Sequence, residues 1–438
     1  MTSALSHSLI DLLPASTDRH ARVPLVVLSH LRWGFVFQRP QHLLTRLAKD
    51  FDVYFIEEPV FEEGAAKLKQ SRQPGGIEVL TPVTGVADWG FNDAQMAAMK
   101  PLIAEFMSKR GVVSPIVWLY TPMALPLVAD LEPRAVVYDC MDDLASFKFA
   151  PPELIERERA LMALADVVFT GGPSLYEARK DRHPNIHCLP SAVDAQHFSP
   201  ANLDASSPEG MAAQALHRDM GHPRLGFFGV IDERLDIDLV AGLADARPDW
   251  QIVMAGPVVK IDPASLPQRA NLHWIGMQRY EALPHLLAQW DVCLLPFALN
   301  EATRFISPTK TLEYLAGGKP VVSTPVHDVI SLYGSAVRIG ATPDDFVRAV
   351  EQLLVEPDAD HATWRRTAQA LVDGCTWDDT AHRIASLLGV VAQHGSAEPI
   401  LLEQPVHDRT PRTVPAESAS VPLPMRVSAE RDARVHAS

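Results

Sequence analysis

Short apolar runs alternate with longer amphipathic stretches along most of the chain, a pattern typical of parallel strands joined by crossover helices. Most runs are rich in valine, isoleucine and aromatic residues without polar alternation, as expected of strands covered on both faces. A first series of runs begins at Pro24, Phe51, Gly76, Pro115, Ala135, Asp166 and Asn185, with helices predicted over 41–49, 93–110 and 152–164. A second series begins at Arg224, Trp250, Asn271, Trp290, Lys319 and Ala336, with helices predicted over 236–246, 280–289, 309–316 and 344–354. The sequence therefore predicts an α/β protein of two tandem doubly wound domains that face a cleft.

A polar, proline-bearing stretch that starts at Ser199 separates the two series and marks a domain boundary. We expect an N-terminal domain over 24–198, a linker over 199–222 and a C-terminal domain over 223–376. A last amphipathic helix is predicted over 377–394 and is free to cross back to the N-terminal domain. Residues 1–23 are expected to be flexible, and the proline-rich, charged tail over 395–438 to be disordered.

Length and charge narrow the class of protein. The 438 residues suit two domains, and 39 Lys and Arg against 54 Asp and Glu give a net charge of −15. This excess of acid argues against a general nucleic-acid binder, which needs a basic face. The four cysteines lie far apart without metal-ligand spacing. No signal peptide or membrane-spanning run is evident, so we expect a soluble, cytoplasmic protein.

The segment from Ser307 to Thr324, SPTKTLEYLAGGKPVVST, carries the most information. Ser307 and Pro308 are suited to open a helix, and backbone amides at a helix start can bind an anion. Lys310 falls in the first turn, where the helix dipole disfavours a cation, and a bound phosphate would account for it. Glu313 lies one turn deeper on the same face and could accept hydrogen bonds from a ribose diol. The spacing alone leaves an alternative open, in which Lys310 and Glu313 form a surface ion pair.

These residues resemble the donor-binding segment of GT-B glycosyltransferases, in particular the large retaining family that includes many bacterial cell-surface polysaccharide enzymes. LSHLRWGFVFQRPQHLLTRLA, VVYDCMDD, DVVFTGGPSLYEAR, GFFGVIDERLDIDLV and IVMAGPV are similar to further segments of this family, in the expected order. The similarity runs from about Pro24 to Gln393. It implies two Rossmann-like domains, with a nucleoside-diphosphate sugar bound mainly by the C-terminal domain and an acceptor on the N-terminal domain.

The resemblance also implies roles for individual residues. Arg234 and Lys310 would contact the donor diphosphate, and Glu313 the ribose. The glycine loop at Gly34 would close on the pyrophosphate, with Arg39 nearby. The remaining donor-binding candidates are Gly229, Ser307 and Thr309. The nucleotide sugar, expected to be UDP-linked, is a co-substrate, and no cofactor or metal is expected.

Two departures from the family pattern affect sugar recognition more than nucleotide binding. The family has a second glutamate, separated by seven residues from the position of Glu313, and this chain has Phe305 there. Glu301 is a weak substitute. An Asn-Gly pair of the interdomain segment is replaced by Ser191-Ala192.

The acceptor side offers several candidates at strand ends. The acidic group that includes Asp139 and Asp142 ends the strand VVYDCMDD, and Asp142 is the preferred catalytic candidate, although helix capping would also explain it. His30, after the first strand, is expected to face the cleft. Trp118 and Tyr138 would stack on an acceptor sugar or pack in the core, the latter being commoner for aromatics in strands. The helix over 93–110 would either touch a membrane surface that holds a lipid-linked acceptor or pack on its own sheet.

The chemistry that these residues suit is glycosyl transfer to a glycan or lipid-linked acceptor in cell-surface or exopolysaccharide synthesis. Cations aimed at the leaving diphosphate supply the largest catalytic effect, and they can do so without a metal. If the configuration of the sugar is retained, the leaving phosphate can take the acceptor proton and no separate base is needed, whereas inversion needs one. Two alternatives stay open: a sugar-nucleotide epimerase of the same fold, and a non-catalytic nucleotide-binding relative.

Overall fold

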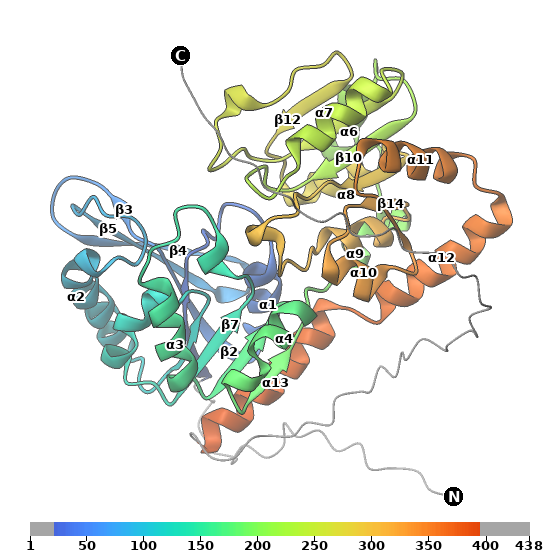
Figure 1. Cartoon of the computed structure of the whole chain (residues 1–438). Coiled ribbons are helices and arrows are strands. Elements are labelled where there is room, and N and C mark those ends of the chain that lie inside the picture. Colours follow the sequence, from blue (N-terminus) through green and yellow to red (C-terminus); the bar gives the residue numbers. More distant parts are fainter. Residues whose placement is uncertain (1–21, 395–438) are drawn as a thin grey trace, which may run out of the picture. The chain divides into compact units, whose positions relative to one another are not determined.

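The computed structural model describes residues 22–394, in which two mainly parallel sheets are covered by helices (Figure 1). The α/β class and the doubly wound sheets predicted from the sequence are confirmed. The predicted disordered tail, 395–438, lies outside the described residues. So does the predicted flexible N-terminus up to residue 21.

The first sheet holds nine of the described strands, in the order β3-β5-β2-β1-β6-β7-β8-β9, with β4 paired to β5. All neighbours run parallel except β4 and β5, which are antiparallel. The strands are β1 (Val23–Ser29), β2 (Phe51–Glu57), β3 (Val60–Phe61), β4 (Lys67–Arg72), β5 (Glu78–Thr84), β6 (Ile116–Leu119), β7 (Ala135–Cys140), β8 (Val167–Thr170) and β9 (Ile186–Cys188).

The second sheet holds six described strands, all parallel, in the order β12-β11-β10-β13-β14-β15. The order reverses beside β10, which is the point in such sheets where a ligand crevice forms at the carboxyl ends of the strands. The strands are β10 (Arg224–Phe228), β11 (Gln251–Ala255), β12 (Leu272–Gly276), β13 (Val292–Leu295), β14 (Val321–Ser323) and β15 (Val337–Ile339).

Helices connect the strands and cover the sheets (Figure 1). With the first sheet come α1 (Arg39–Leu47), α2 (Asp93–Arg110), α3 (Leu154–Leu164) and α4 (Pro173–Arg179). The chain continues through α5 (Ala195–Phe198), α6 (Pro208–His217), α7 (Ile237–Ala246), α8 (Leu283–Ala288), α9 (Lys310–Ala316), α10 (His327–Tyr333), α11 (Pro343–Leu354), α12 (Asp358–Asp373) and α13 (Trp377–His394).

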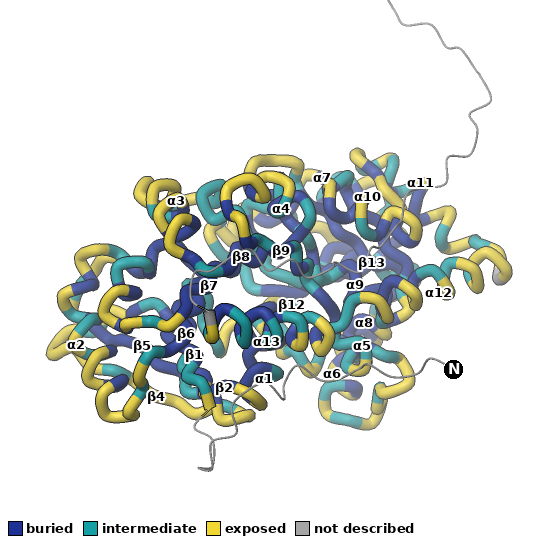
Figure 2. Tube along the Cα trace, turned by 90° about the horizontal axis from the view of Figure 1, so that it is seen from below, coloured by how far each residue is buried: buried dark blue, intermediate teal, exposed yellow. Residues whose placement is uncertain are grey.

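The absence of polar alternation in the strands follows from burial on both faces. Along β11, Ile252 and Met254 pack with α7 and α11 on one side of the sheet. Val253 and Ala255, which alternate with them, pack with α8, α9, α10 and α12 on the other side. Figure 2 shows such strands buried beneath helices whose outer surfaces are exposed. Successive side chains of a strand point to opposite faces, so every position of β11 from Ile252 to Ala255 must be apolar.

The last helix connects the end of the second series of elements to the first sheet. Residue Val193 pairs with Thr376 just before α13 begins, and α13 then packs against α1. The indole of Trp377 stacks on the imidazole of His42, and Arg46 forms an ion pair with Asp378. The helix thus fixes α1, whose first residue belongs to the pocket described below.

The strand β4 and the helices α6 and α12 are among the elements that were not predicted. The strand β4, with the sequence KLKQSR, is mostly exposed, and nothing in its pattern marks it as a strand because only its pairing with β5 defines it. The helix α6 lies within the predicted linker, where Ser207 caps it by accepting from the Gly210 amide. The helix α12 is amphipathic and buries Ala368 and Leu371 against α9.

The apolar side of α2 packs in the core of the first sheet, which agrees with the second of the two interpretations of this helix. Met96, Met99, Ile103, Phe106 and Met107 belong to one buried cluster with strand residues. These side chains are therefore not available to a membrane surface. Among the helices of residues 22–394, none has the length and apolar character needed to cross a bilayer.

Gly226 in β10 allows us to test the packing of the second sheet. A Cβ at this position would stand 1.8 Å from the ring of Trp290, which is 1% exposed. We expect Gly226→Ala to lower the free energy of unfolding by about 2 kcal/mol or more, since a rigid buried ring cannot move aside without strain. Chemical denaturation measures the change. The control is Gly389→Ala in α13, where a Cβ meets no atom within 4 Å and should stabilise by about 0.5–1 kcal/mol. Equal midpoints for Gly226→Ala and the unchanged protein would contradict the packing described.

Candidate nucleotide-sugar site

A pocket lies at the carboxyl ends of the strands and is lined by both halves of the chain. The first half contributes the segment 36–39, the pair 141–142 and Ser191. The second half contributes segments that follow β10, β11, β12 and β13, and the start of α9. Of the predicted site residues, the lining includes Arg39, Asp142, Gly229, Arg234, Ser307, Thr309, Lys310 and Glu313. Gly34, His30 and Asp139 are not among the lining residues.

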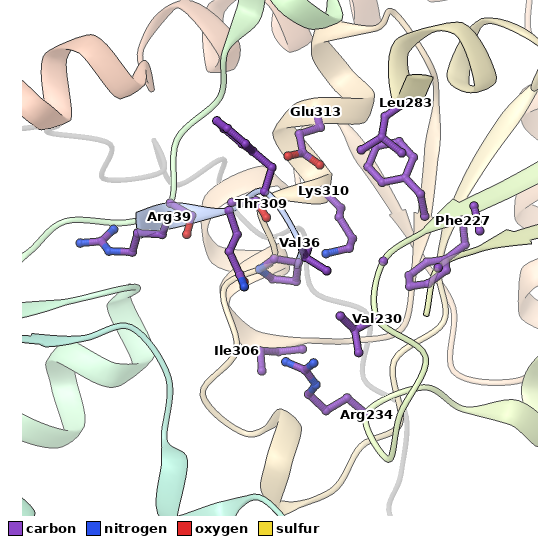
Figure 3. Close-up of a pocket in the computed structure, with 18 of the residues that line it drawn as sticks. Val36, Arg39, Phe227, Val230, Arg234, Leu283, Ile306, Thr309, Lys310 and Glu313 are labelled. Atoms are coloured by element: carbon purple, nitrogen blue, oxygen red, sulfur yellow. The ribbon is translucent and has the colours of Figure 1, made fainter. Parts of the chain in front are cut away.

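Lys310 is the first residue of α9 and reaches into the pocket (Figure 3). Ser307 was predicted to cap this helix, and that prediction is wrong. The helix begins three residues later, and Thr309 at the N-cap makes no capping hydrogen bond through its side chain. In this first turn, Thr311 is the first residue whose backbone amide has an acceptor, the Pro308 carbonyl oxygen at 3.2 Å. The amides of Thr309 and Lys310 have no such partner among residues 22–394, so they remain able to donate to a ligand.

Two glycines make room for Lys310. A Cβ on Gly229, which follows β10, would stand 2.2 Å from Lys310 Cε. Gly229 has φ +155°, and Gly256, which follows β11, has φ +153°. A Cβ on Gly256 would stand 1.7 Å from the Gly229 carbonyl oxygen. A side chain on Gly229 would therefore displace the end of Lys310, and one on Gly256 would displace the backbone of Gly229.

Arg234 enters the same space from the loop between β10 and α7 (Figure 3). Its guanidinium donates to both carboxylate oxygens of Asp232, with Nε at 3.0 and 3.1 Å and Nη2 at 2.7 Å. Asp232 is 3% exposed and also accepts from the Arg234 backbone amide. Burial opposes the charge on Arg234, but the hydrogen bonds to Asp232 keep its pKa above the ordinary value. The sequence analysis did not identify Asp232 as a site residue. Its position two residues before Arg234, an expected phosphate ligand, could have indicated that the two side chains pair.

Glu313 lies one turn after Lys310 and is 8% exposed. Burial raises the pKa of Glu313 to about 7, although the charge of Lys310 opposes the shift. Burial in turn lowers the pKa of Lys310. The two side chains do not form an ion pair among those of the described residues, so the surface-pair alternative does not hold. A buried carboxylate without a direct cation partner is costly, which indicates that a ligand is its partner.

Asp142 is the acidic side chain that the first half of the chain presents to these cations. It follows β7 and lines the pocket. Burial raises the pKa of Asp142 to about 6, while the charges of Arg234 and Lys310 act in the opposite direction. The carboxyl is therefore mostly ionised at physiological pH and able to accept a hydrogen bond or a proton from a substrate.

Arg39, Asp139 and His30 occupy different positions from those expected. Arg39 lines the pocket with its stem, but its guanidinium points away from Lys310 (Figure 3) and is bonded to Asp139. Asp139 is 0% exposed and faces Arg39 and not the pocket. His30 is partly buried, and burial lowers its pKa to about 4.

The interpretation of Trp118 and Tyr138 as core residues is confirmed. They are 0% and 2% exposed, respectively. A different aromatic group, missed from the sequence, lies at the pocket instead. The ring of Tyr280 is stacked between Phe37, with ring centroids 4.4 Å apart, and His197, at 4.0 Å. Phe37 lines the pocket, so this stack joins its wall to the second half of the chain.

Phe305, which replaces the expected glutamate, packs against the apolar cluster of the first sheet. It is not a lining residue of the pocket. Glu301 is exposed and pairs with Arg304 at 3.7 Å, also outside the lining. Ser191 does line the pocket, and Ala192 beside it is buried.

Asp236 and Asp238 have the spacing of a metal-binding pair but belong to the start of α7. The Asp236 carboxylate accepts from the Leu239 amide at 2.8 Å, which is an N-cap bond. Within residues 22–394, no three His, Cys, Asp or Glu side chains are grouped as they would be around a metal ion.

The comparisons with known proteins agree with this geometry. Residues 222–356, which include Arg234, Lys310 and Glu313, match the family described as glycosyl transferases group 1. A Bacillus subtilis (strain 168) protein, named as the teichuronic acid biosynthesis glycosyltransferase TuaH, is 26% identical over 258 residues. That match covers 54% of this chain and 62% of the length of the relative.

Solved structures with the same fold cover most of the described chain. Sucrose-phosphate synthase from Thermosynechococcus elongatus has a TM-score of 0.64 at 14% identity, over 84% of this chain and 99% of its own. The Anabaena protein HepE in complex with UDP-glucose has a TM-score of 0.59 at 14% identity, over 84% and 100%. By fold, the protein is a GT-B protein. More particularly, residues 222–356 match glycosyl transferases group 1, in agreement with the resemblance in the sequence.

The raised pKa of Glu313 predicts a pH-dependent effect on stability. Because the pKa of Glu313 is about 7 in the folded state against 4.5 for the exposed group, the free energy of unfolding falls as the pH rises from 4.5 to 7, and the full cost is present above pH 7. Glu313→Gln should therefore raise the free energy of unfolding at pH 8, by up to about 3 kcal/mol, and have little effect at pH 4. Denaturation at the two pH values measures this difference. Glu153→Gln, at an exposed position, controls for the substitution itself. A gain of the same size at both pH values would rule out this explanation.

Proposed function

We propose that the protein is a glycosyltransferase, which moves a sugar from a nucleoside-diphosphate sugar to a glycan or lipid-linked acceptor in cell-surface or exopolysaccharide synthesis. The observation that carries the proposal is the arrangement of Lys310, Arg234 and Glu313 around one pocket. Two cations and unbonded amides suit a diphosphate, and a buried carboxylate one helical turn away suits a ribose diol.

Similar proteins support the choice of a UDP-linked donor. The HepE structure holds UDP-glucose, and a trehalose-6-phosphate protein from E. coli, with a TM-score of 0.62 at 12% identity, is bound with UDP-2-fluoro glucose. The name of the Bacillus subtilis relative, in turn, supports a role in the synthesis of a cell-surface polymer. We place the reaction at the cytoplasmic side of the membrane, where nucleotide sugars are made.

In the proposed reaction, the bond between the sugar C1 and the distal phosphate oxygen breaks, and a bond between C1 and the acceptor oxygen forms. Negative charge grows on the leaving diphosphate as the first bond breaks. Lys310 and Arg234, fixed by Gly229 and Asp232, stabilise that charge more than they stabilise the ground state. These cations allow the reaction to proceed without a metal ion.

We propose that the sugar keeps its configuration, and that the acceptor proton passes to the leaving diphosphate oxygen. Asp142 approaches from the opposite side of the pocket and accepts a hydrogen bond from the acceptor hydroxyl. If the product were inverted, Asp142 would be the base that takes the proton. The anomeric configuration of the product, read by NMR, distinguishes the two outcomes.

Nucleotide binding and turnover test the proposal together. A nucleotide or nucleotide sugar at about 100 times its Kd should stabilise the fold by about 2.7 kcal/mol. We expect a selective thermal shift within a set of UDP, GDP, ADP and dTDP ligands, which Glu313→Ala abolishes. Lys310→Ala should lower turnover about 10²-fold or more. Arg304→Ala, an exposed cation of the same segment outside the pocket, should leave turnover unchanged.

Other outcomes point to the alternatives. Conversion of the donor sugar without any acceptor would identify an epimerase. Nucleotide binding without turnover of any donor would favour the non-catalytic relative, in which Phe305 replaces the carboxylate that faces the sugar. Full turnover by a folded Lys310→Ala variant would disprove the role of the lysine.

The pKa of Asp142 predicts the acid side of the pH profile. At saturating donor, turnover should fall as the pH drops through about 6, because protonation weakens the hydrogen bond that the carboxylate accepts from the acceptor hydroxyl. In Asp142→Asn this limb should disappear, and turnover at pH 7.5 should be lower by 10-fold or more. An unchanged profile in this variant would exclude Asp142. Saturating donor keeps the titration of Glu313 out of the measurement.

A further inference from the structure

One buried guanidinium joins the three segments through which the first sheet reaches the pocket. Arg39 Nε donates to the two carboxylate oxygens of Asp139 at 3.2 and 2.9 Å. Its Nη1 donates to the Leu189 carbonyl oxygen at 2.9 Å. Arg39 is 2% exposed and Asp139 is 0% exposed, so water does not compete with these bonds.

Each partner lies close in sequence to a lining residue of the pocket. Arg39 itself ends the lining segment 36–39, Asp139 precedes Asp142, and Leu189 precedes Ser191. The segment 33–38 is in turn bound to α1, since Gln41 Nε2 donates to the carbonyls of Trp33 and Val36 at 2.9 and 3.1 Å. A shift of the guanidinium would therefore move all three segments relative to one another.

Stability alone does not account for this arrangement. Removing two charges from water costs several kcal/mol, and apolar side chains of similar size often fill such a space without loss. In addition, Arg39 Nη2 is buried without a hydrogen-bond partner among the described residues. Unbonded buried polar groups add a further cost. We therefore infer that the directional hydrogen bonds of Arg39 serve the geometry of the neighbouring pocket.

We propose that Arg39 is a positioning residue, which aligns the segments 36–39, 141–142 and Ser191 so that Asp142 meets a donor held by the second sheet. The inference rests on the proposed function for its kinetic consequence, but the alignment itself is a property of the fold. It differs from the direct contact with the donor that the resemblance implied, because the guanidinium points away from Lys310 (Figure 3).

The test uses Arg39→Met combined with Asp139→Leu, which removes both charges and keeps the volume. The pair should unfold within a few degrees of the unchanged protein, whereas Arg39→Met alone leaves a buried carboxylate unpaired and should be far less stable. Hydrogen exchange is then read by mass spectrometry. We expect peptides that cover the three segments to exchange at least 10-fold faster, and those of β10 and β11 to stay unchanged.

The matched control is Arg157→Met. Its guanidinium also joins separate segments of the same half, since it bonds to Asp93 and to the carbonyls of Phe91 and Met123 at 3.5 and 3.0 Å. None of these residues lines the pocket. Faster exchange should be confined to those segments, with turnover unchanged.

Kinetics separate positioning from donor contact. In the double variant we expect the Kd for UDP to change less than about 3-fold and kcat to fall about 30-fold or more, since small misplacements of reacting groups are costly. Arg39→Lys keeps the positive charge but loses the planar set of guanidinium donors. Its kcat should lie between those of the double variant and the unchanged protein.

The opposite results overturn the proposal. Unchanged exchange in the three segments, or full kcat in a folded double variant, would show that the pair only stabilises the fold. A raised Kd for UDP with unchanged kcat would restore the direct contact. If the unchanged protein transfers no sugar, the proposed function fails. The hydrogen-exchange measurement then still tests whether Arg39 aligns the three segments.

Discussion

The site depends on the close packing of the Lys310 stem against the backbone of Gly229. Because a Cβ on Gly229 would stand 2.2 Å from Lys310 Cε, only glycine leaves the end of the lysine side chain in this position. Gly256 meets the same constraint one strand further, against the carbonyl of Gly229. Two neighbouring parallel strands are thus each followed by a glycine, and the absence of side chains there leaves room for the lysine. The positions of Glu313 and of the unbonded amides of the first turn follow from where this helix begins, whereas Asp232 holds Arg234.

Ionisable side chains are buried on both sides of the pocket, and their burial lowers the stability of the fold. Burial raises the pKa of Glu313 to about 7 and that of Asp142 to about 6, and it lowers that of Lys310. A protein selected for stability alone would replace or pair these groups. In the proposed complex, the diphosphate would be the partner of Lys310 and the ribose that of Glu313. Binding of the donor would then offset the free energy lost by burying these groups. Arg234 is the exception, since Asp232 keeps it charged and fixed before any ligand arrives.

The two halves of the chain are joined around the pocket by contacts of several kinds. The ring of Phe147 lies between the cations of Arg234 and Lys260, at 5.2 and 4.9 Å, and the amide of Lys148 donates to Glu233 at 3.2 Å. On another side, the Ser174 amide donates to Asp328 at 3.1 Å. Phe305 adds an apolar contact where a carboxylate was expected. The residue at that position therefore packs at the junction of the halves and does not line the pocket.

The sequence by itself determined the fold class, most of the strands and the cluster of donor-side candidates. Continuous apolar runs identify buried parallel strands, and Ser307 to Gly318 carries its phosphate and ribose candidates within one helical turn of each other, where spacing is enough. The tertiary structure decided what depends on distant partners. Only pairing with β5 makes a strand of KLKQSR, and only the fold sets Arg39 against Asp139, 100 residues away, and not toward the donor. The stack of Phe37, Tyr280 and His197 is likewise invisible in sequence, because its three rings come from segments that meet only after folding.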